Sequence, residues 1–215
     1  MFVFFKVERS QNLVYIAIAI FIIILIVLTV IFSSNQLTQA YISHEYLSNG
    51  WIDSGERNYE ESFLGLEKQA TFKYKIDESY DTSYPAFLTV TSIKTIFMIN
   101  EEELLSKTIE IINLASKEKN ITIDKDSKIE GERILNNRHG TFYVIFNGTY
   151  NSNNVSESIK IIGETWNCPI SGKSVICIGV AQITDNYYNN SYEDLQRWNE
   201  IIDKNGLIYN VNCHR

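Results

Sequence analysis

The most apolar part of the chain lies near its N-terminus, where residues 13–32 read LVYIAIAIFIIILIVLTVIF without a charge. As a helix that rises about 1.5 Å per residue, a segment of this length would span roughly 30 Å, the thickness of a bilayer core. Cleavable secretory signals have shorter apolar stretches of about 7–15 residues. The pattern therefore predicts a single-pass transmembrane helix that serves as a signal anchor, although Thr38-Gln39-Ala40 leaves signal cleavage open as an alternative.

Basic residues set the expected orientation of this helix. Lys6 and Arg9 precede it, and the next basic residue after it is Arg57. The positive-inside rule then places residues 1–12 in the cytoplasm and the C-terminal domain outside. The expected localisation is the cell membrane, with the lipid bilayer contacted through residues 13–32.

Beyond the apolar segment, residues 33–65 are polar and lack periodicity, which is typical of an extracytoplasmic stalk. Residues 66–215 carry the patterns of a folded, exported domain. Period-two alternation or β-branched and aromatic runs predict strands, and short polar turns between the later ones favour an antiparallel meander. The predicted strands are 70–76, 86–99, 127–135, 141–150, 157–167, 174–184 and 207–211.

Two segments have the three- and four-residue apolar spacing of helices. The first begins at Asn100, a capping residue with Glu103 three positions on, and its apolar stripe includes Leu104, Thr108 and Ile112. The second begins at Ser191 and ends before Gly206. These elements predict an α+β fold, an antiparallel sheet packed by two helices and preceded by one transmembrane helix.

The order of elements resembles the PsbP-like α/β/α sandwich. In wording, the runs TVTSIKTI, KIIGETWNCPISGKSVICIGVAQITDN and GLIYNVNCH resemble a group of membrane-anchored exported proteins of ammonia-oxidising archaea. This resemblance covers most of residues 50–215. It implies the same anchored architecture, but it carries no catalytic motif that could be transferred.

Charge narrows the classes of partner. The chain has 19 Lys and Arg against 26 Asp and Glu, a net charge of −7. Nucleic acids and anionic lipid head groups both select basic surfaces. The negative net charge therefore argues against binding to nucleic acid. It favours an exported domain that stays soluble because copies of it repel one another.

The tripeptide Gly172-Lys173-Ser174 matches the last three residues of the phosphate-binding loop motif. Such a loop needs an earlier glycine, but position 167 is Asn, and it needs a helix after the serine. Residues 175–183 read VICIGVAQI, which predicts a strand instead. We therefore expect no bound nucleotide and interpret the tripeptide as a hairpin turn.

Three cysteines are the next candidates for chemistry. In an exported domain, cysteines tend to oxidise. A hairpin centred on Gly172 and Lys173 would place Cys168 opposite Cys177, whereas pairing of Cys168 with Cys213 would close a longer loop. We expect a disulfide from Cys168 to Cys177 or Cys213, and the sequence leaves the partner open.

Sulfur and imidazole together suit copper or zinc. The chain ends in Cys213-His214-Arg215, and its other histidines are His44 and His139. No pair shows the spacing of common metal motifs, and His139 is interpreted as a turn residue. The prediction is no cofactor and no metal, with Cys213 and His214 as the candidate ligands should one bind.

Other motifs add little. Sequons predict glycosylation at Asn120, Asn147, Asn154 and Asn189 if the host modifies such sites. No nucleophile stands in a strand–turn–helix context, so no catalytic residue is assigned and an enzyme is not expected.

The favoured hypothesis is a membrane-anchored, non-enzymatic binding or assembly module for another envelope or membrane protein. The alternative is a metal-binding or redox-linked exported protein that uses its Cys and His residues.

Overall fold

The computed structural model describes residues 18–23, 37–62, 66–80, 85–152, 155–183 and 195–214. The chain divides into two units, Met1–Gln36 and Leu37–Arg215. In the first unit the described residues form a short helix. The second unit contains all the remaining elements.

The predicted membrane anchor is corrected by the structure. Of residues 13–32, only 18–23 are described, and the rest of the predicted span lies outside the described residues. Within the described ranges, no helix is long and apolar enough to cross a membrane. The signal anchor, and the single-pass cell-membrane localisation that rested on it, are therefore not retained.

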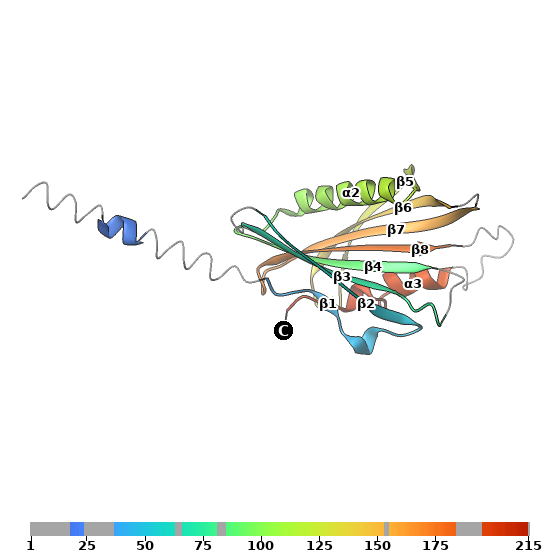
Figure 1. Ribbon diagram of the computed structural model, residues 1–215, viewed down its shortest axis with the longest axis horizontal. Helices are drawn as coiled ribbons and strands as arrows, with labels where there is room; N and C mark the ends of the chain where they lie inside the picture. The colour runs from blue at the N-terminus through green and yellow to red at the C-terminus, as the bar shows by residue number, and fades with distance from the viewer. Residues whose placement is uncertain are drawn as a thin grey trace, which may run out of the picture. The chain divides into compact units, whose positions relative to one another are not determined.

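The second unit is built mainly from long strands (Figure 1). The elements, in chain order, are β1 (Tyr41–Ile42), η1 (His44–Tyr46), β2 (Trp51–Glu61), β3 (Glu67–Ile76), β4 (Ala86–Thr95), α2 (Glu101–Glu118), β5 (Ile121–Ile134), β6 (Gly140–Ser152), β7 (Val155–Cys168), β8 (Lys173–Gln182), α3 (Gln196–Ile202), η4 (Ile208–Asn210) and β9 (Val211–Asn212).

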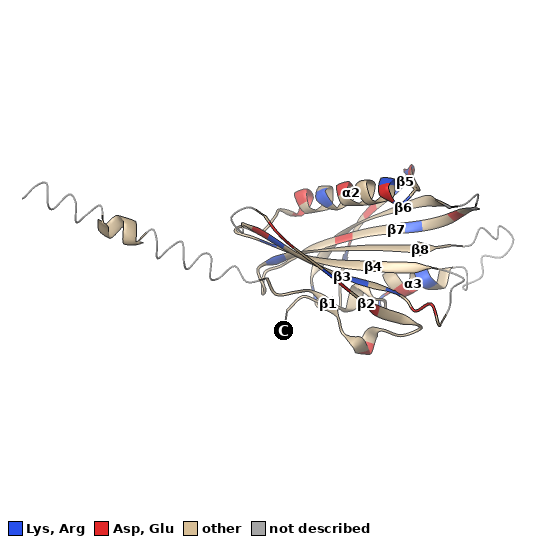
Figure 2. Ribbon diagram, in the orientation of Figure 1, with Lys and Arg blue, Asp and Glu red and all other residues tan. Residues whose placement is uncertain are grey.

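Seven of these strands form one antiparallel sheet in the order β2-β3-β4-β8-β7-β6-β5. Two meanders make up this order, β2 to β4 and β5 to β8, and α2 connects them along the chain. They join where β4 pairs with β8, with Val90 opposite Cys177. Strand β8, at the centre of the sheet, is largely apolar and is drawn in tan along most of its length (Figure 2). Lys173 is its only charged residue.

This architecture corrects the predicted fold class. The chain is mostly β, because the sheet is wider and its strands are longer than the patterns indicated. Of the two helices that were expected to pack it, α3 has only 7 residues in the described part of the chain, and no transmembrane helix precedes the sheet there. The fold is thus a seven-stranded antiparallel sheet with few helices.

Helix α2 covers one face of the sheet. Its predicted cap is confirmed, since Asn100 Oδ1 accepts a hydrogen bond from Glu103 N at 2.8 Å. The buried stripe includes Leu104, Thr108 and Ile112. A Cβ at Gly163 of β7 would lie only 2.6 Å from Thr108 Cγ2, so glycine there lets the helix approach the sheet closely.

The opposite face is covered by α3 and by the small β1–β9 sheet. A Cβ at Gly179 of β8 would lie 2.7 Å from Ile201 Cγ2 of α3, so this glycine admits the helix. The backbone N–H groups of Ala40 and Ile42 donate to Ser92 Oγ at 2.6 Å and Tyr74 Oη at 2.8 Å. These bonds fix β1 over the sheet and enclose the largest hydrophobic cluster.

Residues 37–61, which lie within the segment expected to be a stalk, supply β1, η1 and β2 of this unit. Strand β2 is an edge strand, and beyond its first residues it is largely exposed. Charged edge strands resist pairing with other chains, and they lack the apolar alternation by which strands are recognised in a sequence. This explains why β2 was not predicted.

The β7–β8 hairpin has a different register from the one expected. Cys168 lies opposite Lys173, and Cys177 lies opposite Glu164. Residues 169–172 form the whole turn, in which Gly172 has a positive φ of 59° and its N–H donates to Cys168 O at 2.8 Å. The turn was expected to centre on Gly172 and Lys173, and that register is wrong. The strand predicted after Ser174 is confirmed.

Candidate metal centre

Three segments that are distant in the sequence bring two cysteines and two histidines together. His139 comes from the β5–β6 turn, Cys168 ends β7, and Cys213 and His214 follow β9. One nitrogen or sulfur atom of each residue lies within 4.8 Å of the corresponding atoms of the other three. Both cysteines are at most 1% exposed, and both histidines are partly buried.

The position of His139 is set by a tight turn. Arg138 has a positive φ of 65°, and Leu135 N donates to His139 O at 3.0 Å. The side chain of Asn137 accepts a hydrogen bond from His139 N at 3.1 Å. The left-handed conformation of Arg138 and the hydrogen bond from Asn137 to the backbone of His139 together form a tight turn. This turn holds the backbone that carries the imidazole.

The C-terminal tail is fixed by a short backbone ladder and by the side chain of Asn137. Strand β9 pairs with β1, so that Val211 lies opposite Ile42. Asn137 Nδ2 donates to Val211 O at 3.2 Å, and it also lies 3.9 Å from Cys213 Sγ. The same turn that presents His139 therefore also positions Cys213.

Three of the distances within the cluster are close to those of a tetrahedral site, and all lie within 4.8 Å. Cys213 Sγ lies 3.1 Å from His139 Nε2 and 3.5 Å from His214 Nδ1. Cys168 Sγ lies 3.5 Å from His214 Nδ1. Metal–sulfur bonds near 2.3 Å and metal–nitrogen bonds near 2.0–2.1 Å imply separations of roughly 3.3–3.8 Å between tetrahedral ligands. Only small movements would bring all four atoms around one ion.

Burial controls the protonation of these groups. It raises the pKa of Cys213 to about 12, and the neighbouring Cys168 adds to the effect. Burial, with a smaller contribution from His214, lowers the pKa of His139. At neutral pH the metal-free site therefore holds Cys213 as a thiol and His139 as a neutral imidazole, the form in which histidine ligates metals.

Trp166 supplies a donor next to the sulfur atoms. Its side chain is 1% exposed, and its Nε1–H has no partner at hydrogen-bonding geometry among the described residues. The nearby indole lowers the pKa of Cys213, against the larger effect of burial. A buried N–H close to a sulfur atom is better satisfied by a thiolate than by a thiol, and metal-bound sulfur is a thiolate.

The cluster reaches a cavity at one side. A cavity of about 660 Å³ is lined by Thr38, Phe72, Lys173, Cys213 and His214, among others. Cys213 and the partly buried His214 are the members of the cluster that line it. The cluster therefore borders this cavity through Cys213 and His214.

The arrangement suits metal binding better than catalysis. A buried thiol whose pKa is raised is a poor nucleophile. Four protein ligands close a tetrahedral site and leave no position for a reactive water, as in structural sites. Two sulfur and two nitrogen ligands are typical of soft or borderline transition metals.

The predicted residues are found in different places. Cys213 and His214 lie in the cluster and are joined there by Cys168. Cys177 lies opposite Glu164, about 13 Å along the strand from Cys168 at 3.3 Å per residue, which is beyond the reach of a disulfide. All three cysteines are free here, so a Cys168–Cys213 bond stays a prediction. His44 lies in η1, apart from the cluster.

His139 was the ligand that sequence reasoning missed. It was interpreted only as a turn residue, and no local spacing connects it to Cys168 or Cys213. The sequence signal was the Asn-Asn-Arg-His-Gly turn itself, which becomes informative only when the tail is known to pack beside it.

The glycosylation predictions stay predictions. Asn120 and Asn147 are exposed, whereas Asn154 and Asn189 lie outside the described residues.

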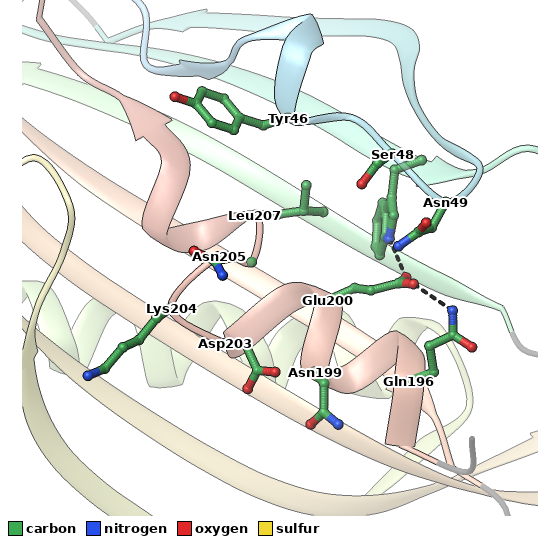
Figure 3. A pocket seen from close by; sticks show the side chains of 12 residues that line it. Tyr46, Ser48, Asn49, Gln196, Asn199, Glu200, Asp203, Lys204, Asn205 and Leu207 are labelled. Atoms are coloured by element: carbon green, nitrogen blue, oxygen red, sulfur yellow. Dashed lines mark hydrogen bonds between the residues drawn. The ribbon is translucent and has the colours of Figure 1, made fainter. Parts of the chain in front are cut away.

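A cavity of about 800 Å³ lies between α3 and the β1–β2 region (Figure 3). Its most buried acid, Glu200, accepts hydrogen bonds from Trp51 Nε1 at 2.8 Å, from Arg197 Nη1 at 2.9 Å and from Gln196 Nε2 at 2.9 Å. The oxygen atoms of this carboxylate are already occupied by three side-chain donors, which gives it a structural role. We therefore assign no chemistry to this cavity.

Comparison of the chain with protein families, curated proteins and solved structures found no match. The resemblances drawn from the sequence stay untested, and the function must be argued from the site itself.

Proposed function

We propose that this protein binds one soft transition-metal ion through His139, Cys168, Cys213 and His214. The observation that carries the proposal is the convergence of four ligand atoms from three separate segments within 4.8 Å. Cysteine and histidine are both ligands of soft and borderline metal ions, so a shared ion accounts for their close approach in a buried part of the domain. The proposal adopts the metal-binding alternative from the sequence.

The ion would fasten the C-terminal tail to the sheet. Without it, the last residues are held by the two-residue β1–β9 ladder and by the side chain of Asn137. Ligands from β7 and from the β5–β6 turn would add cross-links over long sequence separations. Metal binding to the folded state alone stabilises that state by mass action.

The competing role, an assembly module for another protein, has no specific observation in its favour. The membrane attachment on which it was based is not found in the described residues. A partner protein stays a prediction from sequence.

The direct test is a metal titration of the full reduced chain, with bound metal measured after gel filtration. The proposal expects one ion per chain. Replacement of His139 with Gln should abolish tight binding, whereas replacement of His44 with Gln should not. Equal metal content in the two variants would contradict the proposal.

A further inference from the structure

A buried lysine lies beside the candidate metal centre. Lys173 is the first residue of β8 and the cross-strand partner of Cys168, so the two side chains share a face of the sheet. The residue is 1% exposed. Lysine is almost never buried to this extent unless its charge is compensated.

The hydrogen bonds of Lys173 do not compensate its charge. Its Nζ donates to Thr38 O at 2.6 Å and lies 3.3 Å from Thr38 Oγ1. Both acceptors are neutral. In the part of the chain that the structure describes, Lys173 forms no ion pair with a carboxylate, unlike Arg133 and Arg197, which pair with Glu164 and Glu200.

The groups near Lys173 that could carry negative charge are the two cysteines of the cluster. Burial lowers the pKa of Lys173, and Cys213 and Cys168 act in the opposite direction. Lys173 also lines the same cavity as Cys213 and His214. An ammonium here becomes favourable when the neighbouring sulfur atoms are thiolates.

We propose that Lys173 balances the charge of a monovalent metal complex, so that the centre prefers Cu(I) to divalent Zn(II). This inference rests on the proposed metal site and names its preferred ion. Two thiolates, two neutral imidazoles and Cu(I) carry one net negative charge, which the ammonium neutralises. The same ligands with Zn(II) are already neutral, so the ammonium leaves one uncompensated positive charge in the core. In either case the two thiol protons leave to solvent.

A change in charge balance affects the two ions in opposite directions, whereas damage to the site would weaken the binding of both. Loss of the Lys173 charge should weaken Cu(I) binding and strengthen Zn(II) binding. Replacement of a residue that supports metal ligands typically changes metal affinity by about 10–100-fold. We expect the ratio of Cu(I) to Zn(II) affinity to fall by at least about tenfold in Lys173→Met.

The experiment measures both affinities for the full reduced chain by competition, with a colorimetric Cu(I) chelator and with a fluorescent Zn(II) chelator. The variants are Lys173→Met and Lys173→Gln, the second of which keeps an amide donor for Thr38 if the first fails to fold. Lys94→Met is the control for charge near the turn, because Lys94 Nζ lies 3.4 Å from Ser171 O and its charge disfavours the ammonium of Lys173, so its removal should not lower the ratio.

A drop in the affinity ratio in both Lys173 variants, but not in Lys94→Met, supports the inference. An unchanged ratio, with both ions still bound through the four ligands, overturns it and leaves the metal site intact. Failure of the wild-type chain to bind either ion overturns the proposed function as well.

Discussion

Replacement of Cys168 with Ala should abolish the metal-dependent part of the stability of this protein. The substitution removes one of four ligands, and the small apolar side chain is compatible with a position that is fully buried. The quantity to compare is the increase in stability that metal causes in each protein. Without metal, the two proteins differ only by the loss of a buried thiol.

The magnitude can be worked out by mass action. An ion present at 100 times its dissociation constant stabilises the folded state by about 2.7 kcal/mol. In a chain of 215 residues, each kcal/mol shifts Tm by about 2–4 °C. Metal should therefore raise the Tm of the wild-type chain by roughly 5–10 °C, and that of Cys168→Ala by much less.

The assay is calorimetry of the full reduced chain, first with a chelator and then with excess metal. Cys177→Ala is the matched control, since Cys177 is equally buried but lies outside the cluster. The control should retain the full increment, whatever its own stability. An equal increment in Cys168→Ala would refute the assignment of this residue as a ligand.

The described contacts support three further predictions. Burial raises the pKa of Tyr74 to about 12, from an ordinary value near 10. The stability from its neutral phenol should be complete below pH 10 and lost as pH rises through 12, and Tyr74→Phe should lack this alkaline loss in pH-dependent unfolding. Arg133→Met should destabilise the fold by about 3–5 kcal/mol in urea unfolding, because it leaves the fully buried Glu164 without its ion pair, and a loss below about 1 kcal/mol would contradict this. Treatment of the metal-free chain with an azo thiol oxidant should remove two thiol hydrogens and join Cys168 to Cys213, as read by peptide mass mapping, and prior metal binding should protect both.

The sequence predicted the sheet where its strands have a buried face. The runs that became β3, β4, β6, β7 and β8 alternate or are rich in apolar residues, and α2 has a capping box and a clear stripe. Strand β2 was missed because a solvated edge strand lacks both signals. The predicted membrane helix is not found among the described residues.

The sequence identified two of the four residues of the candidate site, Cys213 and His214, as possible metal ligands. Cys213 and His214 are adjacent, which attracts attention to metal chemistry. Cys168 was expected to form a disulfide with Cys177 or Cys213, and the expected hairpin register placed it opposite Cys177. The true register, displaced by four positions, brings Lys173 next to Cys168 instead. Contacts between a turn, a strand end and a tail depend on tertiary packing, so no local pattern could specify them.

X-ray absorption spectroscopy of the metal-loaded full chain tests the central claim most directly, because it identifies the ligand atoms themselves. For Zn(II) we predict two sulfur atoms near 2.3 Å and two imidazole nitrogens near 2.0–2.1 Å, with the sulfur signal halved in Cys168→Ala. A shell of oxygen and nitrogen alone would contradict the metal centre proposed for this protein, since it would place the bound ion away from Cys168 and Cys213.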